Sequence, residues 1–289
     1  MRHIPTLILV GAICLLTTCC SRQKATTVTL MTFSFSDSCR VGDTYSGMLI
    51  TTVDFMAATE VNSLPGEPVI ALNKLILGAV FGKRYENLYD GTLDSYADIY
   101  GYLGRVEEKF AEEFKEELEV DGVDEFGWDP KDGFARERSC YGKPTYLKGN
   151  LFSYCGKQRY AHPDTELPFY TTGMNCNLST MQSLGLKEVF GEDISLWFET
   201  LLERIKSGYP DTYWAVDPEE VSDFFELGLD EPTEEELCEL SLGNFYFDED
   251  GMHFIQELSL TDIYEYALSW NEVSDLFTDS FIAITKGRQ

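Results

Sequence analysis

Two strands followed by two helices are predicted by the apolar and polar positions in the first part of the chain. Residues 28–35 and 46–55 are rich in β-branched and aromatic side chains, which is typical of strands. Beyond a turn at 64–66, apolar side chains recur at helical spacing over residues 68–81. Residues 94–118 carry an apolar stripe opposite a face rich in Glu and Lys, which predicts a longer amphipathic helix.

A second group of strands is predicted after the Gly-containing acidic stretch at 120–133, which interrupts the first pattern. Residues 135–140, 150–160 and 169–178 have the composition of strands, and Gly149 supplies a turn between the first two. Together with the N-terminal pattern, this predicts a chain rich in both strands and helices.

The last third of the chain is predicted to form helices and a hairpin. Residues 218–227 and 233–240 are expected to form short acidic helices, the second with a capping box of Thr and Glu at its start. Residues 244–257 alternate like a β-hairpin with an Asp-Gly turn. A longer helix is predicted over 193–205, starting near Asp193, and its inward-facing side chains are Leu196, Trp197, Thr200, Leu201 and Ile205.

The predicted strands and helices come in blocks instead of alternating strictly, which favours an α+β fold over a doubly wound sheet. We expect antiparallel sheets with helices packed on one face. We also expect two sub-regions, an N-terminal α+β region at 21–133 and a C-terminal α+β domain at 134–289.

Residues 1–20 have the organisation of a secretory signal, with a basic start and an apolar run over 4–16. The run is shorter than the roughly 20 residues of a membrane-spanning helix. The segment Leu-Thr-Thr-Cys that ends at Cys19 resembles the lipobox of bacterial lipoproteins, in which the cysteine is lipidated. We therefore expect a protein of the cell envelope, outside the cytoplasm, anchored to a membrane through Cys19 or alternatively Cys20. A plain cleaved signal would export it as well.

The mature chain is strongly acidic, and the excess of acid is concentrated towards its C-terminal end. Residues 187–289 contain 26 acidic and 5 basic residues, a net charge of −21. Such a surface repels nucleic acid phosphates and anionic lipid headgroups and attracts cationic partners. We therefore expect no nucleic-acid partner, and a solubility coat is the plain alternative to a binding surface.

The cysteines after the signal predict disulfides, because exported proteins mature in oxidising surroundings. Cys140 and Cys155 lie on adjacent predicted strands and are the favoured pair, with Cys155 and Cys176 as the competitor. The chain has no Cys-x-x-Cys motif and only two histidines after the signal, His162 and His253. A Cys/His zinc site is therefore poorly supported, and we expect no metal and no cofactor.

His162 is the first candidate for acid–base chemistry, since Asp164 and Glu166 follow it in the chain. Pro163 stiffens that loop, however, and the sequence lacks the motifs of a serine nucleophile. A structural role for the ring is therefore favoured.

Calcium binding is the second candidate chemistry. Asp248, Asp250 and Glu257 fall at EF-hand spacing around Gly251, but Tyr246 stands at the first ligand position and cannot supply a carboxylate. The flanking residues alternate like strands, so a hairpin turn at Asp250 and Gly251 is favoured.

Several motifs follow one another in a characteristic order between residues 135 and 277. They are Ala161-His162-Pro163, Met174-Asn175-Cys176-Asn177-Leu178, residues 184–190, Asn244-Phe245 with Phe247, Asp250-Gly251-Met252 and Tyr266-Ala267. This order resembles a bacterial domain of unknown function found in the ectodomain of RsiV, a lysozyme-sensing anti-sigma factor, and beside some peptidoglycan deacetylases. Departures from the family pattern are Arg159-Tyr160 for two glycines, Glu188 for Asp and Glu265 for Pro.

The RsiV-like resemblance implies a binding domain, with lysozyme as an example of its cationic protein partner. Together with the acidic charge, it predicts an exported binding protein without catalytic activity. Tyr213 and Trp214 are the favoured exposed anchor, and the acids expected around it are Asp217, Glu219, Glu220, Glu234, Glu235, Asp248 and Asp250.

Two other functions stay open. A cell-wall or other glycan would be bound through exposed aromatic side chains, for which Trp128, Tyr154, Tyr160, Trp214 and Trp270 are available. The third and least favoured reading is a hydrolase that uses His162.

Overall fold

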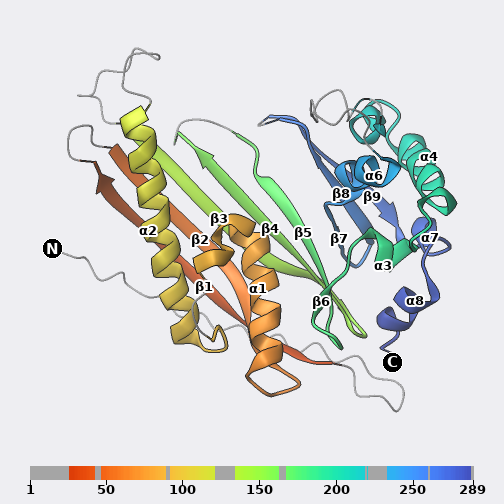
Figure 1. Ribbon diagram of the computed structural model, residues 1–289, viewed down its shortest axis with the longest axis horizontal. Helices are drawn as coiled ribbons and strands as arrows, with labels where there is room; N and C mark the ends of the chain where they lie inside the picture. The colour runs from red at the N-terminus through yellow and green to blue at the C-terminus, as the bar shows by residue number, and fades with distance from the viewer. Residues whose placement is uncertain are drawn as a thin grey trace. The chain divides into compact units, whose positions relative to one another are not determined.

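A computed structural model describes residues 26–42, 47–88, 92–120, 134–162, 167–218, 220, 233–259 and 261–287. The chain forms two compact units (Figure 1). The first contains Val28–Gly142 and Lys157–Phe169, and the second contains Lys143–Gly156 and the chain from Tyr170 onward. The predicted boundary after residue 133 differs from this division, because two long strands contribute residues to both units.

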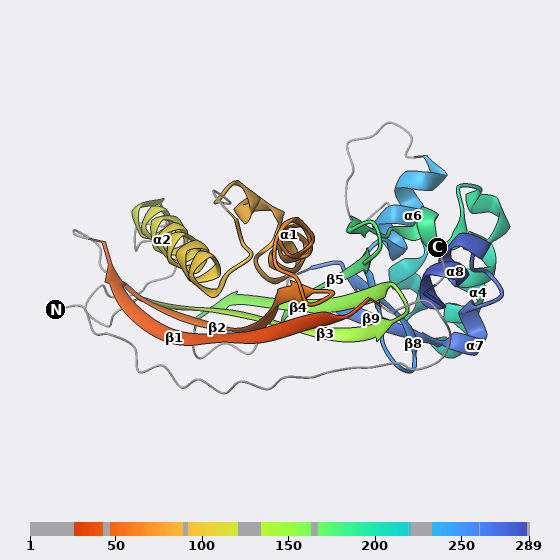
Figure 2. The same cartoon turned by 90° about the horizontal axis from the view of Figure 1, so that it is seen from below.

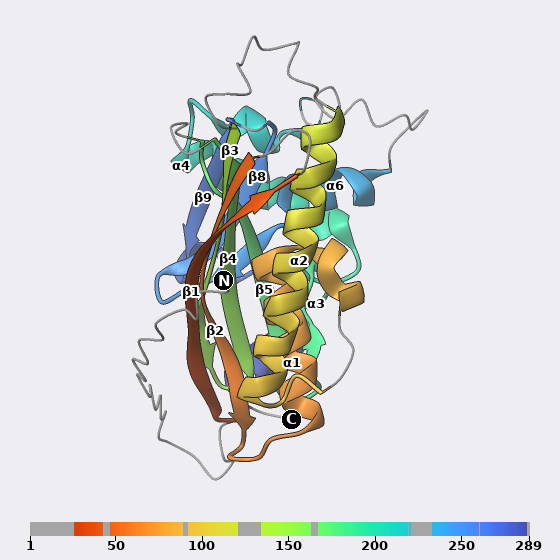
Figure 3. The ribbon, with the colours of Figure 1, turned by 90° about the vertical axis from the view of Figure 1, so that its left-hand side faces the viewer.

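The first unit is a sheet with two long helices on one face. Strand β1 (Val28–Val41) pairs antiparallel with β2 (Gly47–Val61), and β3 (Phe134–Lys148) lies on the other side of β2. The segment between β2 and β3 forms α1 (Glu67–Phe81), the 3-10 helix η1 (Lys83–Leu88) and α2 (Tyr96–Val120). Figures 2 and 3 show α1 and α2 on the same side of these strands, as the sequence predicts.

The core of the first unit follows from the register of β1 and β2. Phe33 stands directly opposite Phe55, so both rings point to the face that the helices cover. Their centroids lie 5.5 Å apart, and Phe81 of α1 meets Phe55 edge-on at 5.7 Å. All three rings are fully buried, and burial of one such side chain contributes about 1.5–3 kcal/mol.

One buried amide, that of Asn73 in α1, ties the helix to backbone groups around it. Its Oδ1 accepts a hydrogen bond from the Ala58 N–H at 2.8 Å, and its Nδ2 donates to the carbonyls of Ala58 at 2.8 Å and Leu93 at 2.6 Å. The pairing of β1 with β2 shifts by one residue close by, between Thr29 and Leu30. Asn73 therefore satisfies main-chain groups at a point where the ladder is irregular.

A buried ion pair holds α2 against β3. Arg138 of β3 is 92% buried at its side chain, contacts the Glu113 carboxylate at 3.2 Å and donates to the Tyr85 hydroxyl at 2.7 Å. Its guanidinium lies 4.2 Å from the ring centroid of Phe110 and 4.3 Å from that of Tyr160. The charge is thus neutralised inside the unit, which gives this cluster a structural role.

The second unit contains the second half of the sheet and a separate small sheet. Strand β4 (Leu151–Ala161) begins in it after the turn at Gly149, and β5 (Tyr170–Asn177) and β6 (Gln182–Ser183) follow. The helices come next: α3 (Leu186–Phe190), η3 (Ile194–Leu196), α4 (Phe198–Gly208), η4 (Tyr213–Val216) and α6 (Glu234–Leu242). The small sheet is formed by β7 (Phe245–Phe247), β8 (Gly251–Glu257) and β9 (Ile263–Ser269), and the chain closes with α7 (Trp270–Val273) and α8 (Asp279–Thr285).

The fold is α+β with two sub-regions. A sheet of six strands has the order β1-β2-β3-β4-β5-β6, and the second sheet has the order β7-β8-β9. The pair β2–β3 is parallel, which corrects the expectation of purely antiparallel sheets. The helical connection through α1 and α2 explains this, because parallel neighbours need a long crossover between them. The predicted hairpin at 244–257 is confirmed as the antiparallel pair β7–β8.

The predicted helix over 193–205 is split in two. Residues 194–196 form the 3-10 helix η3, and α4 starts only at Phe198. The break rotates Leu196 away from the core, so that 74% of it is exposed, although the sequence analysis placed it inward. Trp197 is buried as predicted, and its indole N–H donates to the Gly191 carbonyl at 3.2 Å. A helical period applied across a 3-10 turn misplaces the residues before it.

None of the helices in the described ranges is long and apolar enough to span a membrane. The helix predicted over 218–227 falls almost entirely outside the described residues, as do residues 1–20, where the signal is predicted, with Cys19 and Cys20.

Candidate functional site

The aromatic anchor predicted at Tyr213 and Trp214 lies on η4, in the second unit. Both side chains are half-buried against the core, so they are less exposed than the sequence analysis expected. Trp214 packs edge-on against Tyr264 of β9 at 5.4 Å, and the ammonium of Lys206 lies 4.5 Å from the Tyr213 ring centroid. Each residue thus remains partly exposed.

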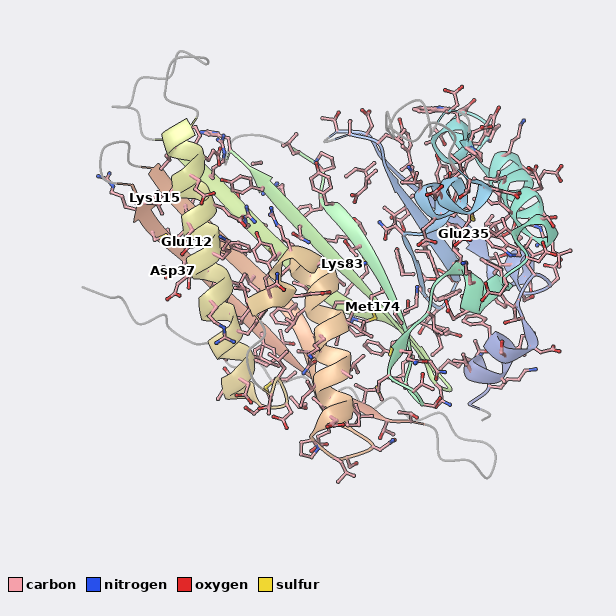
Figure 4. All side chains as sticks on the ribbon, in the orientation of Figure 1. Asp37, Lys83, Glu112, Lys115, Met174 and Glu235 are labelled. Carbon is pink, nitrogen blue, oxygen red and sulfur yellow. The ribbon has the colours of Figure 1, made fainter. Side chains whose placement is uncertain are left out.

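The acids predicted on α6 are exposed, and the predicted capping box accounts for their position. The hydroxyl of Thr233 accepts from the Glu236 N–H at 3.2 Å, and the Glu236 carboxylate accepts from the Thr233 N–H at 2.9 Å. Glu234 and Glu235 then project into solvent from the first turn, and Figure 4 labels Glu235 there. Glu235 contacts Lys187 at 2.5 Å, a surface ion pair of the kind that contributes little to stability.

The helix α6 packs beside η4. Asp217 follows η4 directly and is half-buried, whereas Glu220 is exposed. Glu219 lies outside the described residues. Among the described acids of the prediction near η4, Glu220, Glu234 and Glu235 are exposed.

Asp248 and Asp250 lie in the β7–β8 turn. The Asp248 Oδ1 accepts from the backbone N–H groups of Asp250 at 2.8 Å and Gly251 at 3.0 Å, which fixes the turn. Trp270 of α7 donates its indole N–H to the Asp248 and Glu249 carbonyls, at 3.1 Å each. Asp250 is exposed, but Asp248 is committed to the turn and only 28% exposed at its side chain. Asp250 is therefore the residue of this pair that remains available to a partner.

Sequence reasoning missed a polar cluster on the small sheet, here named the His253 cluster: Tyr246, Asp248, His253 and Glu265. The His253 Nδ1 hydrogen-bonds the Glu265 Oε1 at 2.8 Å, and its Nε2 lies 2.8 Å from the Asp248 Oδ2, at an angle short of hydrogen-bond geometry. The Tyr246 ring stacks on the imidazole at 4.6 Å and donates its hydroxyl to the same Glu265 oxygen at 2.7 Å. Hairpin register could have paired Tyr246 with His253, but Glu265 comes from a strand that the sequence analysis left unassigned.

The carboxylates around His253 govern its protonation. The hydrogen bond that Glu265 accepts from the imidazole and the charges of Asp248 and Glu265 raise the pKa of the imidazole above its ordinary value of 6.5, against the opposing effect of burial. Tyr246 is held strongly in its neutral form, since burial and the Glu265 carboxylate raise the pKa of its phenol. The Nδ1 of the imidazole is engaged by Glu265, and its Nε2 faces the Asp248 carboxylate.

His162 lies directly after β4 in the first unit and is half-buried. Asp164 and Glu166, with which the sequence analysis grouped it, lie outside the described residues. Among the described ranges, no cluster of three His, Cys, Asp or Glu side chains is placed to hold a metal ion.

The predicted disulfide between Cys140 and Cys155 is wrong for this structure, where Cys140, Cys155 and Cys176 are all free thiols. Cys140 stands eight residues before the end of β3, whereas Cys155 stands four residues after the start of β4. Along a hairpin this offset amounts to about 13 Å, more than twice the Cα separation that a disulfide spans. Burial raises the pKa of the Cys140 and Cys176 thiols to about 12, which keeps both protonated.

The asparagines in the motifs of the resemblance join β5 to β7. Asn175 accepts from the Ser153 hydroxyl at 2.6 Å and donates to the Phe245 carbonyl at 2.8 Å. Asn244 accepts from the Gly173 N–H at 2.8 Å and donates to the Thr171 carbonyl at 2.7 Å. These motif residues hold the strands of the second unit together. The resemblance in these motifs therefore concerns the fold and does not identify a ligand.

The aromatic side chains considered for glycan binding differ in how far they are buried. Tyr154 is fully buried, Tyr160 is half-buried and donates to Glu117, and Trp270 packs on Phe247 at 5.3 Å. Trp128 lies outside the described residues. Trp214 is half-buried, as are Tyr160 and Trp270.

Comparison with known proteins bears on the fold. No protein family model and no curated protein matches the chain. Its structure is similar to that of a DUF3298 family member from Bacteroides fragilis, with a TM-score of 0.56 and 15% identity over 90% of this chain and 97% of the other. A DUF3298 family protein from Pseudomonas aeruginosa has a TM-score of 0.46 and 9% identity, over 87% of this chain and 95% of the other. The chain therefore has the α+β fold of a bacterial domain of unknown function.

Proposed function

We propose that this protein is an exported, lipid-anchored binding protein that recognises a cationic protein such as lysozyme and has no catalytic activity. The observation that carries the proposal is the charge imbalance of residues 187–289. With 26 acidic and 5 basic residues between positions 187 and 289, at least 21 acids have no Lys or Arg of their own within that stretch. An uncompensated field of this size accelerates association with a basic partner and sets its salt dependence.

Affinity beyond loose attraction requires an apolar anchor, because charge alone mainly affects the rate of encounter. The half-buried pair Tyr213 and Trp214 supplies rings that are already fixed by packing on Tyr264 and beneath Lys206. Fixed aromatic rings lose little conformational entropy when a partner covers them. We therefore assign the anchor to η4 and the charged rim to the start of α6.

Lysozyme binding by matched charge reversals tests this assignment. Glu234→Lys on α6 should weaken binding several-fold, whereas Glu112→Lys, an exposed helical glutamate of the first unit, should change it little (Figure 4). Trp214→Ala should weaken binding by more than either reversal, since anchor residues carry on the order of 2 kcal/mol or more. Equal effects of the two reversals, with none from Trp214→Ala, would reduce the interaction to nonspecific attraction.

Glycan binding is the second candidate, and the partly exposed ring of Trp214 is the observation that favours it. Stacking on a sugar does not depend on ionic strength, whereas the acidic surface loses affinity as salt rises. A pull-down from cell-wall fragments and from basic secreted proteins, at low and high salt, separates the two candidates.

A further inference from the structure

The His253 cluster joins all three strands of the small sheet to the β7–β8 turn. Tyr246 comes from β7, His253 from β8 and Glu265 from β9, while Asp248 belongs to the turn itself. The side chain of His253 is only 15% exposed, against 28% for Asp248 and 43% for Glu265. The imidazole is therefore held between two carboxylates from different elements, largely away from water.

Only the doubly protonated imidazole suits this arrangement. A carboxylate accepts hydrogen bonds but cannot donate one, and neutral imidazole has a single N–H. Loss of the proton would leave a ring lone pair 2.8 Å from a carboxylate oxygen, with two negative charges no longer separated by a positive one. The stack of Tyr246 on the ring, at 4.6 Å and 7° between planes, adds a contact that is also stronger with the cation.

The charge on His253 is connected to the turn through the two oxygens of Asp248. One oxygen faces His253, and the other accepts from the N–H groups of Asp250 and Gly251. Trp270 closes the same turn from α7 through its indole N–H. A change at the imidazole therefore acts on a turn whose backbone bonds depend on the same carboxylate.

Other titratable groups lie on the elements around β8, and two of them accept backbone hydrogen bonds. Glu257 on β8 accepts from the Thr171 N–H at 2.6 Å, and Glu272 on α7 accepts from the Ser269 N–H at 2.8 Å. Cys155 on β4 faces Tyr246, and Glu239 lies on α6. His253 is the group in this neighbourhood whose ordinary pKa lies near neutral pH.

We propose that the His253 cluster is a proton-dependent clamp, in which the imidazolium locks the β7–β8 turn to the small sheet and its deprotonation loosens the turn. The folded-state pKa of His253 is raised above 6.5, so the stabilisation is complete below that pH. It is lost as the pH rises through the folded-state pKa. The clamp is a property of the fold and does not require the binding function proposed above.

Nuclear magnetic resonance of the purified protein tests the clamp without any substitution. We expect the imidazole resonances of His253 to titrate with a midpoint above 6.5, and the indole N–H resonance of Trp270 to shift with the same midpoint. A midpoint at or below 6.5, or a Trp270 resonance that does not follow His253, overturns the proposal.

Variants assign the effect to this histidine. His253→Gln should abolish the Trp270 transition and reduce the fall in thermal stability between about pH 5.5 and about pH 8.5. His162→Gln, which alters the other histidine after the signal, should leave both unchanged and serves as the control. Unaltered pH dependence in a folded His253→Gln protein contradicts the clamp, and the wild-type titration decides the matter if the variant does not fold.

Discussion

Asn73 illustrates how single polar residues fix this fold. Its amide makes three hydrogen bonds, all to backbone groups, and the residue is fully buried. Asn175 and Asn244 have the same role in the second unit, where they connect β5 to β7. Buried amides of this kind are expensive to replace, because their partners are left without hydrogen bonds.

We predict that Asn73→Ala destabilises the protein by on the order of 2–4 kcal/mol, since the N–H of Ala58 and two carbonyls lose their partner. Denaturant unfolding followed by circular dichroism measures this. Lys74→Ala, at the exposed neighbouring position, is the control and should cost less than about 0.5 kcal/mol. A similar small cost for both substitutions contradicts the assigned role.

The proposed membrane anchor also depends on a single residue. Cys19→Ser should move the protein from the membrane to the soluble fraction without unfolding it, because each buried lipid methylene contributes about 0.8 kcal/mol to attachment. Fractionation of expressing cells measures this, with Cys39→Ser, a half-buried cysteine of β1, as the control. Full membrane association in both Cys19→Ser and Cys20→Ser would show that lipid on these residues is not the anchor.

Individual helices and strands were predicted correctly where residues close together in the sequence determine the structure. The helical spacing over 68–81 and the alternation over 244–257 each produced the expected element, α1 and the β7–β8 hairpin. The capping box at Thr233 fixed the start of α6 in the same way. The observed strands β1 and β2 are longer than expected. Their polar ends lack a strand-like composition and are stabilised by pairing of the two strands with each other.

Other features of the structure depend on contacts between distant parts of the chain. The pattern of apolar and polar residues alone does not predict them. The parallel pairing of β2 with β3 follows from the path of α1 and α2, and the exposure of Leu196 follows from a 3-10 turn. The thiols of Cys140 and Cys155 are free, and their unequal distances from the turn between β3 and β4 account for this. The His253 cluster includes Glu265 from a third strand, β9, so no local sequence motif predicts the cluster.

The β7–β8 hairpin offers a sharp test at this scale. A Cβ added at Gly251 would overlap the Leu268 carbonyl of β9, so Gly251→Ala should force β8 and β9 apart. We expect a loss of about 1–3 kcal/mol in unfolding free energy, the usual cost of overpacking. Gly208→Ala in the same unit has no atom within 4 Å of the added methyl group and should be tolerated. Equal stability of the two variants, measured by thermal unfolding, argues against this close approach.

At the scale of the whole molecule, acidity is the dominant property. The chain has a formal net charge of −28, and the residues from 187 onward contribute −21 of it. Self-repulsion of this size favours solubility but opposes compaction, so the folded state should become more stable as salt rises. Binding to a basic protein should weaken over the same range of salt. Opposite responses to salt are therefore expected for stability and for binding.

The proposed function depends on specific recognition of a cationic protein. Isothermal titration of lysozyme into the purified protein tests it most directly, at about 0.15 M salt, where the Debye length is about 8 Å and loose attraction is largely screened. We predict saturable one-to-one binding that weakens as salt rises further and is weaker in Trp214→Ala than in the unaltered protein. Heat that never saturates at this salt, or no binding at all, would contradict the account.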